Sequence, residues 1–279
     1  MSDWLIASSY VIGQGHISKN MPCQDKTFKL IDRKYYIKKR KKRFLKHKII
    51  PISINTLDTR SSFYGLSLAD GAGSCKYSDI GAELITKKIL QYIKINFDNL
   101  FIDESIRLTL TSHIENELYK ITTDNIAFKD LSSTLLFIAI KNNKFIIGHI
   151  GDGIIGMLDK SDNLKIISKP DNGEFSNSTF FTTSINYKDR LRLLKGTLKN
   201  SKGFIVMSDG AGESLYNKKE ELLSDTSSVI INWLKTHNER DVEEALCSNL
   251  EQIISKNTSD DCSIGIMRLK ETIKYSVPT

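Results

Sequence analysis

The chain places an aspartate directly after a short apolar run at two points, and glycines follow each aspartate. The stretch SLADGAGS, residues 67–74, contains Asp70, and the stretch VMSDGAGESL, residues 206–215, contains Asp209. A short apolar run that ends at glycine predicts a buried strand entering a loop, because glycine adopts backbone angles that other residues avoid. Each carboxylate is therefore expected at the exposed end of a rigid strand.

These carboxylates allow two interpretations. Asp-Gly pairs form turns well for conformational reasons alone, and a turn is the better interpretation of either stretch by itself. Two further strand edges also carry aspartates, however: Asp25 in PCQDKTF, and Asp260 with Asp261 in TSDDCSIGIM. Gathered carboxylates repel one another unless positive charge neutralises them, and Mg²⁺ and Mn²⁺ prefer oxygen ligands. If the fold brings these strand ends together, the sequence predicts a site for divalent cations.

The composition favours a folded protein of the cytoplasm without a membrane partner. The 279 residues are 40% hydrophobic and 26% charged, enough for one large domain or two small ones. No apolar run approaches the roughly 18 residues of a membrane helix, and the first residues lack the basic start and cleavage site of a signal peptide. The four cysteines have no CxxC spacing, which argues against a zinc site or a disulfide framework. No linker divides the chain, so we expect a single domain over residues 1–279.

Much of the net charge of +7 lies in RKYYIKKRKKRFLKHK, residues 33–48. Like charges repel and no core could bury them, so a solvent-exposed insertion, as a loop or hairpin, is the favoured interpretation. The alternative is a surface that attracts nucleic acid, anionic lipid or an acidic phosphorylated partner. No known nucleic-acid module surrounds the stretch, which makes nucleic acid the less favoured partner.

The order of the predicted elements favours an α+β fold. Short apolar runs bounded by turn residues predict strands at 3–12, 25–32, 61–69, 133–141, 144–151, 153–158, 203–209 and 262–269. Helical patterns lie at 78–97, 103–122, 227–237 and 242–255. Strands grouped with strands, and helices in pairs, argue for layers and against a doubly wound parallel sheet.

The first two predicted helices have apolar residues at helical spacing. In the first, Ser78 or Asp79 is placed to form the N-cap, and the apolar positions are Ile80, Leu84, Tyr92 and Ile95. In the second, one face carries Ile106, Leu110, Ile114, Leu118 and Ile121. We expect both helices to lie against a sheet.

Five motifs in this order, CQD, LADGAGS, HIGDG, VMSDGAG and DDCSIGIM, make the chain resemble the metal-dependent protein phosphatases of the 2C type. The resemblance runs from about residue 8 to residue 269, and GQGHISKNMPCQD and GEFSNSTFF (residues 173–181) are similar to the bacterial branch of the family. It implies two packed antiparallel β-sheets flanked by helix pairs. It also implies hydrolysis of phosphoserine and phosphothreonine by a water that bridges two Mn²⁺ or Mg²⁺ ions, without a protein nucleophile.

The resemblance also implies the metal ligands. Asp70 would bridge the two ions, joined by the carbonyl of Gly71. Asp209 and Asp260 would complete the shell of one ion, and Asp25 would hold ordered waters of the other. Asp260 is preferred to its neighbour Asp261 because it heads the acidic, polar, apolar, hydroxyl series of the family pattern. Asp152 in HIGDG matches a family aspartate to which we assign a structural role.

The chain departs from the family pattern at the group that protonates the leaving oxygen. Many members have a histidine immediately after the Asp-Gly pair, where this chain has Ala72. Many also hold the phosphate with an arginine near the first strand, where this chain offers His16. His16 is therefore our candidate catalytic residue, to contact phosphate or donate a proton. Asp130 is off by one from a third-metal position of some relatives and is left out of the site, and His149 is expected to pack.

Three functions are compatible with these features. The first is a serine/threonine protein phosphatase whose partners are phosphorylated proteins, such as a cognate serine/threonine kinase or its targets. The second is a regulatory pseudophosphatase that binds phosphoproteins without turnover, suggested by the missing histidine and arginine. The third is a nucleic-acid-associated module that uses the basic insertion and binds in a strongly salt-dependent way. The complete set of carboxylates favours the first.

Overall fold

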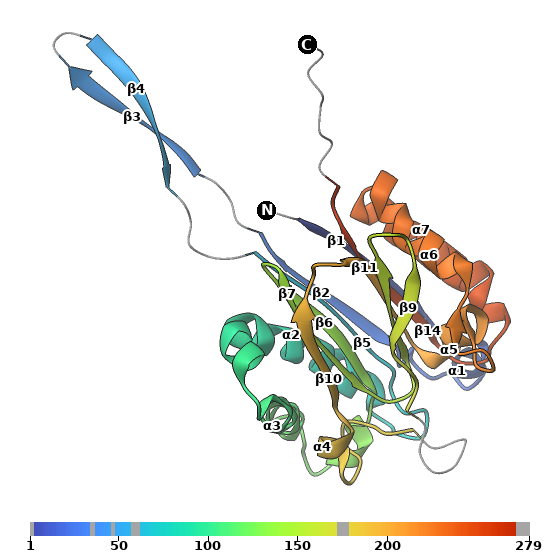
Figure 1. The fold of residues 1–279 in the computed structure, drawn as a ribbon. Helices are drawn as coiled ribbons and strands as arrows, with labels where there is room; N and C mark the ends of the chain where they lie inside the picture. The colour runs from blue at the N-terminus through green and yellow to red at the C-terminus, as the bar shows by residue number, and fades with distance from the viewer. Residues whose placement is uncertain (1–2, 34–36, 46–47, 57–61, 172–178, 272–279) are drawn as a thin grey trace.

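Two antiparallel β-sheets of five strands each form the centre of the molecule (Figure 1). The computed structural model describes residues 3–33, 37–45, 48–56, 62–171 and 179–271, with backbone only for the second and third of these ranges. The first sheet has the order β1 (Trp4–Val11), β14 (Cys262–Leu269), β11 (Ser201–Met207), β8 (Ile154–Asp159) and β9 (Leu164–Ser168). The second has the order β10 (Arg192–Thr197), β7 (Lys144–Ile150), β6 (Leu135–Lys141), β5 (Phe63–Ala69) and β2 (Lys26–Asp32).

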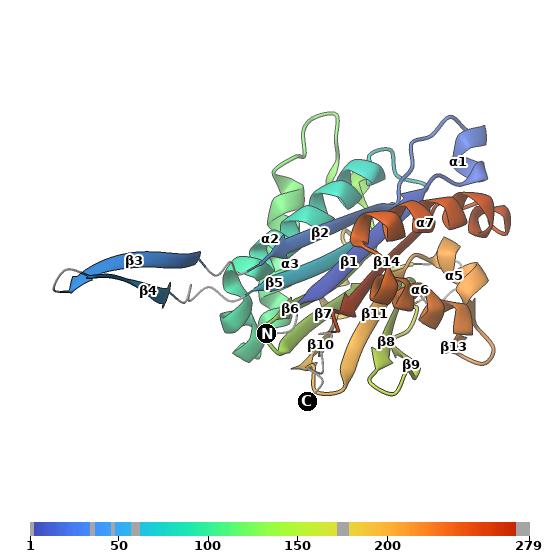
Figure 2. The same ribbon diagram turned by 90° about the horizontal axis from the view of Figure 1, so that it is seen from above.

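Helix pairs cover the outer faces of both sheets (Figure 2). Helices α2 (Ser78–Ile102) and α3 (Ile106–Tyr119) pack on the second sheet, and α6 (Asp225–Thr236) and α7 (Glu239–Gln252) pack on the first. A third apolar core lies between the sheets and includes Trp4 and Phe204, whose ring centroids are 5.6 Å apart. The predicted α+β fold of two packed sheets flanked by helix pairs is therefore confirmed.

Shorter elements connect these layers. They are α1 (Gln14–Ser18), α4 (Tyr187–Arg190), α5 (Asp209–Leu215), the 3₁₀ helices η1 (Phe128–Leu131) and η2 (Ile254–Lys256), and the strands β12 (Tyr216–Asn217) and β13 (Leu222–Leu223). Among the described helices, none combines the length and the apolar character that crossing a lipid bilayer requires.

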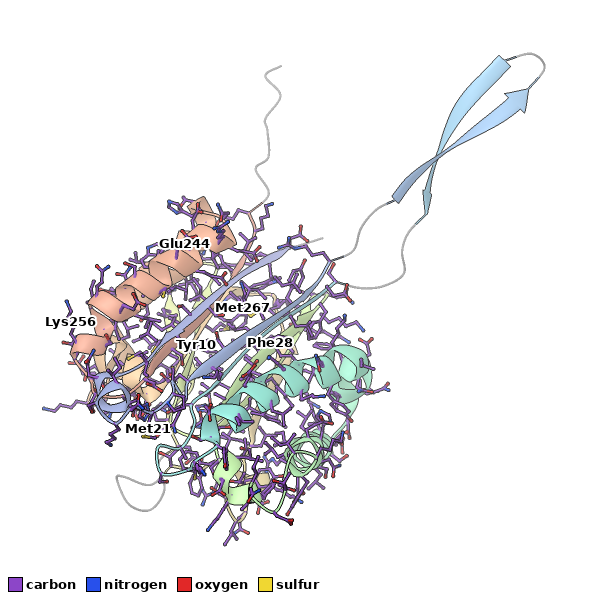
Figure 3. The ribbon with its side chains drawn as sticks, turned by 180° about the vertical axis from the view of Figure 1, so that it is seen from behind. Tyr10, Met21, Phe28, Glu244, Lys256 and Met267 are labelled. Atoms are coloured by element: carbon purple, nitrogen blue, oxygen red, sulfur yellow. The ribbon has the colours of Figure 1, made fainter. Side chains whose placement is uncertain are left out.

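The edge strands β1 and β2 lie side by side and connect the two sheets. Figure 3 shows β1 with Tyr10 and β2 with Phe28 between α7, which carries Glu244, and α2. The hydroxyl of Thr27 on β2 donates a hydrogen bond of 3.0 Å to that of Ser8 on β1. This hydrogen bond joins β1 at the edge of the first sheet to β2 at the edge of the second. The chain continues from β1 into α1.

Helix α2 differs from the sequence prediction in length, cap and buried face. It continues to Ile102, and its N-cap is Tyr77, so neither Ser78 nor Asp79 caps it. Ile80 and Ile95 are 42% and 80% exposed, whereas the buried face is Ala82, Ile85, Ile89, Ile93 and Phe97. Apolar residues occur on more than one side of this helix, and only the contact with the sheet selects which side is buried.

Helix α3 follows the prediction closely. Ile106, Leu110, Ile114 and Leu118 are all buried, whereas Ile121 lies beyond the end of the helix and is partly buried. Strands β9 and β10, each at one edge of a sheet, were not predicted from the sequence. Most of their residues are partly exposed, so their apolar pattern is weaker than that of the central strands.

The basic insertion contains a separate antiparallel ribbon of β3 (Ile37–Leu45) and β4 (Lys48–Thr56), paired from Ile37 with Thr56 to Leu45 with Lys48. The ribbon joins neither large sheet. It extends past residue 48, where the predicted insertion ends, while residues 34–36 and 46–47 of that insertion lie outside the described residues. The single-domain organisation of residues 1–279 stays a prediction.

Candidate metal centre

Four strand ends or strand connections meet at one end of the sandwich. Asp70 follows β5, Asp152 lies between β7 and β8, Asp209 follows β11, and Asp260 precedes β14. These segments enclose a pocket of about 160 Å³ lined by Asp70, Gly71, Ala72, Gly73, Asp152, Thr179, Phe181, Asp209 and Asp260. Four of the five ligands predicted from the sequence therefore line one pocket, although they are far apart in the chain.

Backbone contacts fix the segment that carries Asp70. The amide of Asp70 donates to the hydroxyl of Thr134 at 2.9 Å, and the amide of Thr134 donates to the carbonyl of Asp70 at 2.7 Å. The amide of Gly71 donates to the carbonyl of Gln24 at 3.2 Å, which connects this segment to the residues just before β2. A Cβ atom at Gly71 would lie 2.9 Å from the backbone and side chain of Ser78. Glycine therefore lets the carboxylate-bearing loop approach the start of α2.

The serine pair Ser208 and Ser263 connects the strands that carry the other two carboxylates. The amide of Ser208 donates to the carbonyl of Ser263 at 3.1 Å, and the amide of Ser263 donates to the hydroxyl of Ser208 at 3.0 Å. Ser208 is followed by Asp209 at the start of α5, and Asp260 lies just before β14. This pairing keeps the two carboxylates at the same end of the sheet.

Asp152 belongs to the carboxylate cluster. One carboxylate oxygen from each of Asp70, Asp152 and Asp209 lies within 4.8 Å of the others. The hydroxyl of Thr179 donates a hydrogen bond to Asp152. Asp152 was predicted to have a structural role. HIGDG nevertheless has the same order of apolar run, aspartate and glycine as the stretches of Asp70 and Asp209, and this signal could have identified it.

Asp25 lies beneath this cluster and is fully buried. Neither of its carboxylate oxygens has a hydrogen-bond partner among the described residues. Burial raises the pKa of Asp25 to about 7, and the nearby hydroxyls of Ser263 and Ser208 oppose this rise without reaching hydrogen-bond geometry. Two unpartnered oxygens on a buried carboxylate are costly unless water or a cation satisfies them.

The other carboxylates repel one another as well. Burial raises the pKa of Asp70 well above its ordinary value, and the charges of Asp25, Asp209, Asp260 and Asp152 add to the rise. Burial, with repulsion from Asp152 and Asp260, raises the pKa of Asp209 to about 7. Burial also raises the pKa of Asp260, although the nearby imidazole of His16 opposes the rise.

This set of groups fits divalent cations. Among the described residues, the ion pairs include none between a lysine or arginine and Asp25, Asp70, Asp152, Asp209 or Asp260. The available donors are carboxylate and carbonyl oxygens, which Mg²⁺ and Mn²⁺ prefer. Uncompensated negative charge, unpartnered oxygens and all-oxygen donors together fit the binding of two such ions.

The raised pKa values predict how the stability of the metal-free protein depends on pH. A carboxyl whose folded pKa exceeds its unfolded value stabilises the fold below the unfolded pKa of about 3.9, and that contribution is lost as the pH rises through the folded pKa. For Asp209 the loss is centred at a pH of about 7. We expect the melting temperature of EDTA-treated protein to fall between about pH 5 and pH 8, and Mn²⁺ to raise it most at the upper end.

Thermal unfolding with and without Mn²⁺ across this pH range measures the effect. In the variant Asp209→Asn, the pH-dependent fall should be smaller, since this group no longer titrates. An equal fall in both proteins, or a metal effect that is largest at low pH, would show that the cluster does not behave in this way.

Asp261 faces away from the pocket, in contrast to Asp260. Its side chain is fully buried, and its two oxygens accept hydrogen bonds of 2.6 Å from the amides of Gly13 and Gln24. This difference supports the preference for Asp260 as a ligand.

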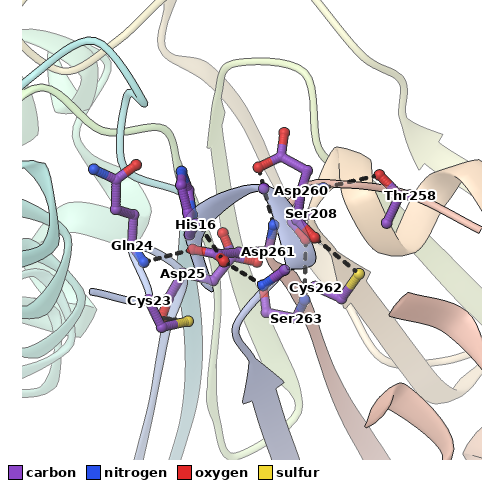
Figure 4. A network of polar contacts seen from close by, with 12 residues as sticks. His16, Cys23, Gln24, Asp25, Ser208, Thr258, Asp260, Asp261, Cys262 and Ser263 are labelled. Carbon is purple, nitrogen blue, oxygen red and sulfur yellow. Dashed lines mark hydrogen bonds and ion pairs between the residues drawn. The ribbon is translucent and has the colours of Figure 1, made fainter. Parts of the chain in front are cut away.

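His16 lies in α1, close to the pocket but not among the residues that line it. Its Nδ1 atom is 2.9 Å from Oδ1 of Asp261, and Figure 4 shows this contact beside Asp25 and Asp260. A Cβ atom at Gly73, which does line the pocket, would lie 3.9 Å from Nε2 of His16. In the candidate catalytic residue His16, Nδ1 therefore contacts Asp261, and Nε2 lies near the rim of the carboxylate pocket.

The residues left out of the predicted site lie elsewhere. Asp130 is in η1, where it accepts a hydrogen bond of 3.2 Å from the amide of Ala127. His149 is buried on β7, and its Nδ1 lies 2.7 Å from the hydroxyl of Ser168. Residues 173–178 of the GEFSNSTFF stretch lie outside the described residues, but Thr179 and Phe181 at its end line the pocket.

A larger cavity of about 450 Å³ adjoins the carboxylate pocket and shares Asp152, Thr179 and Asp209 with it. Its other lining residues are Ile154, Lys169, Pro170, Gly212, Tyr216, Lys218 and Glu221. Lys169 forms an ion pair with Glu221 across part of this cavity. The cavity offers lysines and a tyrosine beside the carboxylates.

Known proteins share this architecture. The structure is similar to a serine/threonine phosphatase from Staphylococcus aureus, with a TM-score of 0.58, 15% sequence identity and coverage of 97% of this chain and 96% of that chain. It is also similar to the catalytic domain of the serine threonine protein phosphatase PstP in complex with two manganese ions, with a TM-score of 0.56, 15% identity and coverage of 97% and 100%. At this identity, the likeness establishes the fold.

The sequence comparisons identify the family. The chain is 23% identical over 197 residues to serine/threonine-protein phosphatase 3 of Escherichia coli (strain K12), which covers 70% of this chain and 68% of that protein. The model of the protein phosphatase 2C family matches residues 55–251. This match covers more than half of the 279 residues and includes Asp70, Asp152 and Asp209. The resemblance seen in the motifs is thus confirmed, and the chain belongs to the protein phosphatase 2C family.

Proposed function

We propose that this chain is a metal-dependent serine/threonine protein phosphatase that uses two Mn²⁺ or Mg²⁺ ions. The observation that carries the proposal is the gathering of Asp25, Asp70, Asp152, Asp209 and Asp260 without a lysine or arginine partner in the described chain. The family match gives independent support. The substrates are phosphorylated proteins, such as a cognate kinase or its targets, and the proposed location is the cytoplasm.

In this proposal the carboxylates that line the pocket hold the ions. Asp70 and the carbonyl of Gly71 lie at the end of β5, and Asp209 and Asp260 face them from the other sheet. Asp152 adds a further carboxylate. Asp25, below them, has both oxygens free to accept hydrogen bonds from ordered water. When bound, the ions supply a nucleophilic water at neutral pH and positive charge for the phosphoryl oxygens.

The protein groups around the ions orient and desolvate the reaction. The partly buried hydrogen bond between Asp70 and Thr134 and the buried one between Ser208 and Ser263 fix the two facing strand ends, so little rearrangement is needed when a phosphate enters. Ala72 is 5% exposed and contributes an apolar wall to the pocket. His16 is the proposed donor of a proton to the departing serine or threonine oxygen.

The adjoining cavity is the proposed site for the peptide around the phosphorylated residue. It shares Asp152 and Asp209 with the carboxylate pocket, so a peptide held there would present its phosphate to the proposed metal ligands. The ammonium group of Lys218 favours an acidic side chain in that peptide, whereas that of Lys169 is already paired with Glu221.

A turnover assay tests the proposal. We expect phosphate release from a phosphoserine or phosphothreonine peptide with Mn²⁺. Excess EDTA should lower the rate at least about 100-fold. Inorganic phosphate released by purified protein is the measured quantity. Tight peptide binding without release in the presence of Mn²⁺ would instead identify a pseudophosphatase, and equal rates with and without EDTA would exclude the metal-dependent reaction.

A further inference from the structure

The short helix α1 packs directly on the segment that leads into β14. The amide of Gly15 donates a hydrogen bond of 2.8 Å to the carbonyl of Ser259. A Cβ atom at Gly13 would lie 2.2 Å from the carbonyl oxygen of Asp260, and one at Gly15 would lie 2.7 Å from that of Ser259. The two glycines therefore allow a backbone approach that fixes His16 against residues 259–261.

Asp261 is the acceptor at the centre of this contact. Oδ2 accepts from the amide of Gln24 at 2.6 Å, and Oδ1 accepts from the amide of Gly13 at 2.6 Å. Oδ1 also lies 2.9 Å from Nδ1 of His16, which makes no aligned hydrogen bond within the described residues, so the contact has the distance of an ion pair. The side chain of Asp261 is fully buried, and that of His16 is 11% exposed. The two amides thus fix the carboxylate, and its ion pair in the described part of the chain is with His16.

The opposite edge of the imidazole is directed toward the carboxylate pocket. Nε2 of His16 and Oε1 of Gln24 lie closest to the open side of Gly73, 3.9 and 3.8 Å from the position of a Cβ atom there. In Figure 4 the side chains of His16, Gln24 and Asp260 point to the same side of the network, away from Ser263. Gly73 lacks a side chain that would separate Nε2 from the pocket.

From this geometry, and resting on the phosphatase function proposed above, we propose that Asp261 is a positioning residue that holds His16 with Nδ1–H toward its carboxylate and Nε2–H toward the leaving oxygen. The carboxylate orients the ring through Nδ1, so that Nε2 is directed at the leaving oxygen, as an acceptor on one imidazole nitrogen does for a proton donor at the other. This chain has alanine where many family members have a histidine after the Asp-Gly pair. In the proposal, His16 of the N-terminal segment, held by Asp261, supplies the proton instead.

Proton transfer to the leaving oxygen accompanies phosphoryl transfer. Water attacks phosphorus and releases one proton to solvent, the bond between phosphorus and the serine or threonine oxygen breaks, and its electron pair stays on that oxygen. Nε2 of His16 gives its proton to this oxygen, so that the free hydroxyl side chain leaves. The neutral imidazole then takes a proton from solvent, and no oxidant or other reactant is needed.

Leaving-group dependence tests the role of Asp261. An alkoxide leaving from phosphoserine needs the proton, whereas the p-nitrophenolate anion leaves without it. For Asp261→Asn we expect kcat on a phosphoserine peptide to fall about 100-fold, with kcat on p-nitrophenyl phosphate reduced less than about three-fold and KM unchanged on both. His16→Gln should show the same selective loss, and the double variant should lose no more than either single one.

The control is Asp124→Asn, which removes one carboxylate from an exposed turn and should leave both rates unchanged. Equal losses on both substrates, or no loss on the peptide, would overturn the role of Asp261. Failure of the proposed phosphatase function would give a different result, because the wild-type protein would then hydrolyse neither substrate with Mn²⁺.

NMR measures the contact between the imidazole of His16 and Asp261 without turnover. In the ¹⁵N spectrum of metal-free wild-type protein, we expect a proton on Nδ1 of His16, and that signal should shift in Asp261→Asn. A neutral ring protonated only at Nε2 would overturn the proposal, even if Asp261→Asn did not fold.

Discussion

Replacing Asp70 by asparagine is expected to abolish Mn²⁺-dependent phosphopeptide hydrolysis and, at the same time, to stabilise the metal-free protein. Asp70 carries one of the carboxylates that would hold the ions, and it is repelled by Asp25, Asp209, Asp260 and Asp152. Without it, the site would lose a central ligand, and we expect kcat/KM to fall by at least about 100-fold. In metal-free protein above about pH 7, the lost repulsion raises the free energy of unfolding.

Steady-state kinetics measure kcat/KM, and urea unfolding in EDTA measures the free energy of unfolding. Mn²⁺ titration calorimetry shows directly whether the variant still binds the metal. Asp209→Asn should behave in the same way, because it has a raised pKa for the same reason. Asp124→Asn is the control, with unchanged activity and stability, since Asp124 lies in an exposed turn. Full activity of Asp70→Asn, or a less stable metal-free protein, would contradict the assignment of the cluster as a cation site.

Adding one methyl group at Gly210 is expected to damage the site almost as severely, although Gly210 is not a proposed ligand. It lies in the first turn of α5, directly after Asp209, and a Cβ atom there would be 2.2 Å from the carbonyl oxygen of Asp261. Backbone on both sides must move apart, which separates the segments of Asp209 and Asp260. We expect Gly210→Ala to lower the free energy of unfolding by about 1–3 kcal/mol and kcat/KM by at least about 10-fold.

The same helix provides a matched control in Gly212. A Cβ atom at Gly212 would lie 3.1 Å from Cδ1 of Ile154, the end of a flexible side chain. Alanine is also favoured over glycine inside a helix by about 0.5–1 kcal/mol, which offsets a small shift of Ile154. We expect Gly212→Ala to change the stability by less than about 1 kcal/mol. Because Gly212 lines the proposed peptide cavity, the comparison rests on urea unfolding, and similar unfolding of the two variants would show that the contact with Asp261 does not hold the site together.

The carboxylates of the site were predictable to the extent that each lies at an end of a predicted strand. Asp70 and Asp209 carry the pattern with glycine, and Asp25 and Asp260 lie beside strands that the sequence also predicted. Asp152 carries the same pattern, but family analogy gave it a structural role, and only the distances showed that its oxygen lies with those of Asp70 and Asp209. A pattern shows where a strand ends but not which other strand ends lie next to it.

Helix α2 shows the same limit, because its sequence did not predict which of its faces is buried. Ile80 and Ile95 recur at helical spacing with other apolar residues, yet they face solvent, while Ile85 and Ile89 lie against the second sheet. Spacing alone could not choose between these faces, because both are apolar. The edge strands β9 and β10 were missed for a related reason, since partly exposed strands carry a weaker pattern.

The sequence by itself determined the α+β class, the central strands, the paired helices and the family, because these depend on local apolar periodicity and on short motifs. The tertiary structure alone decided that Asp152 joins the carboxylates, that Asp260 faces the pocket while Asp261 faces His16, and which side of α2 is buried. These outcomes depend on contacts between segments far apart in the chain. The packing of the two sheets and α1 sets those contacts, and no local pattern encodes them.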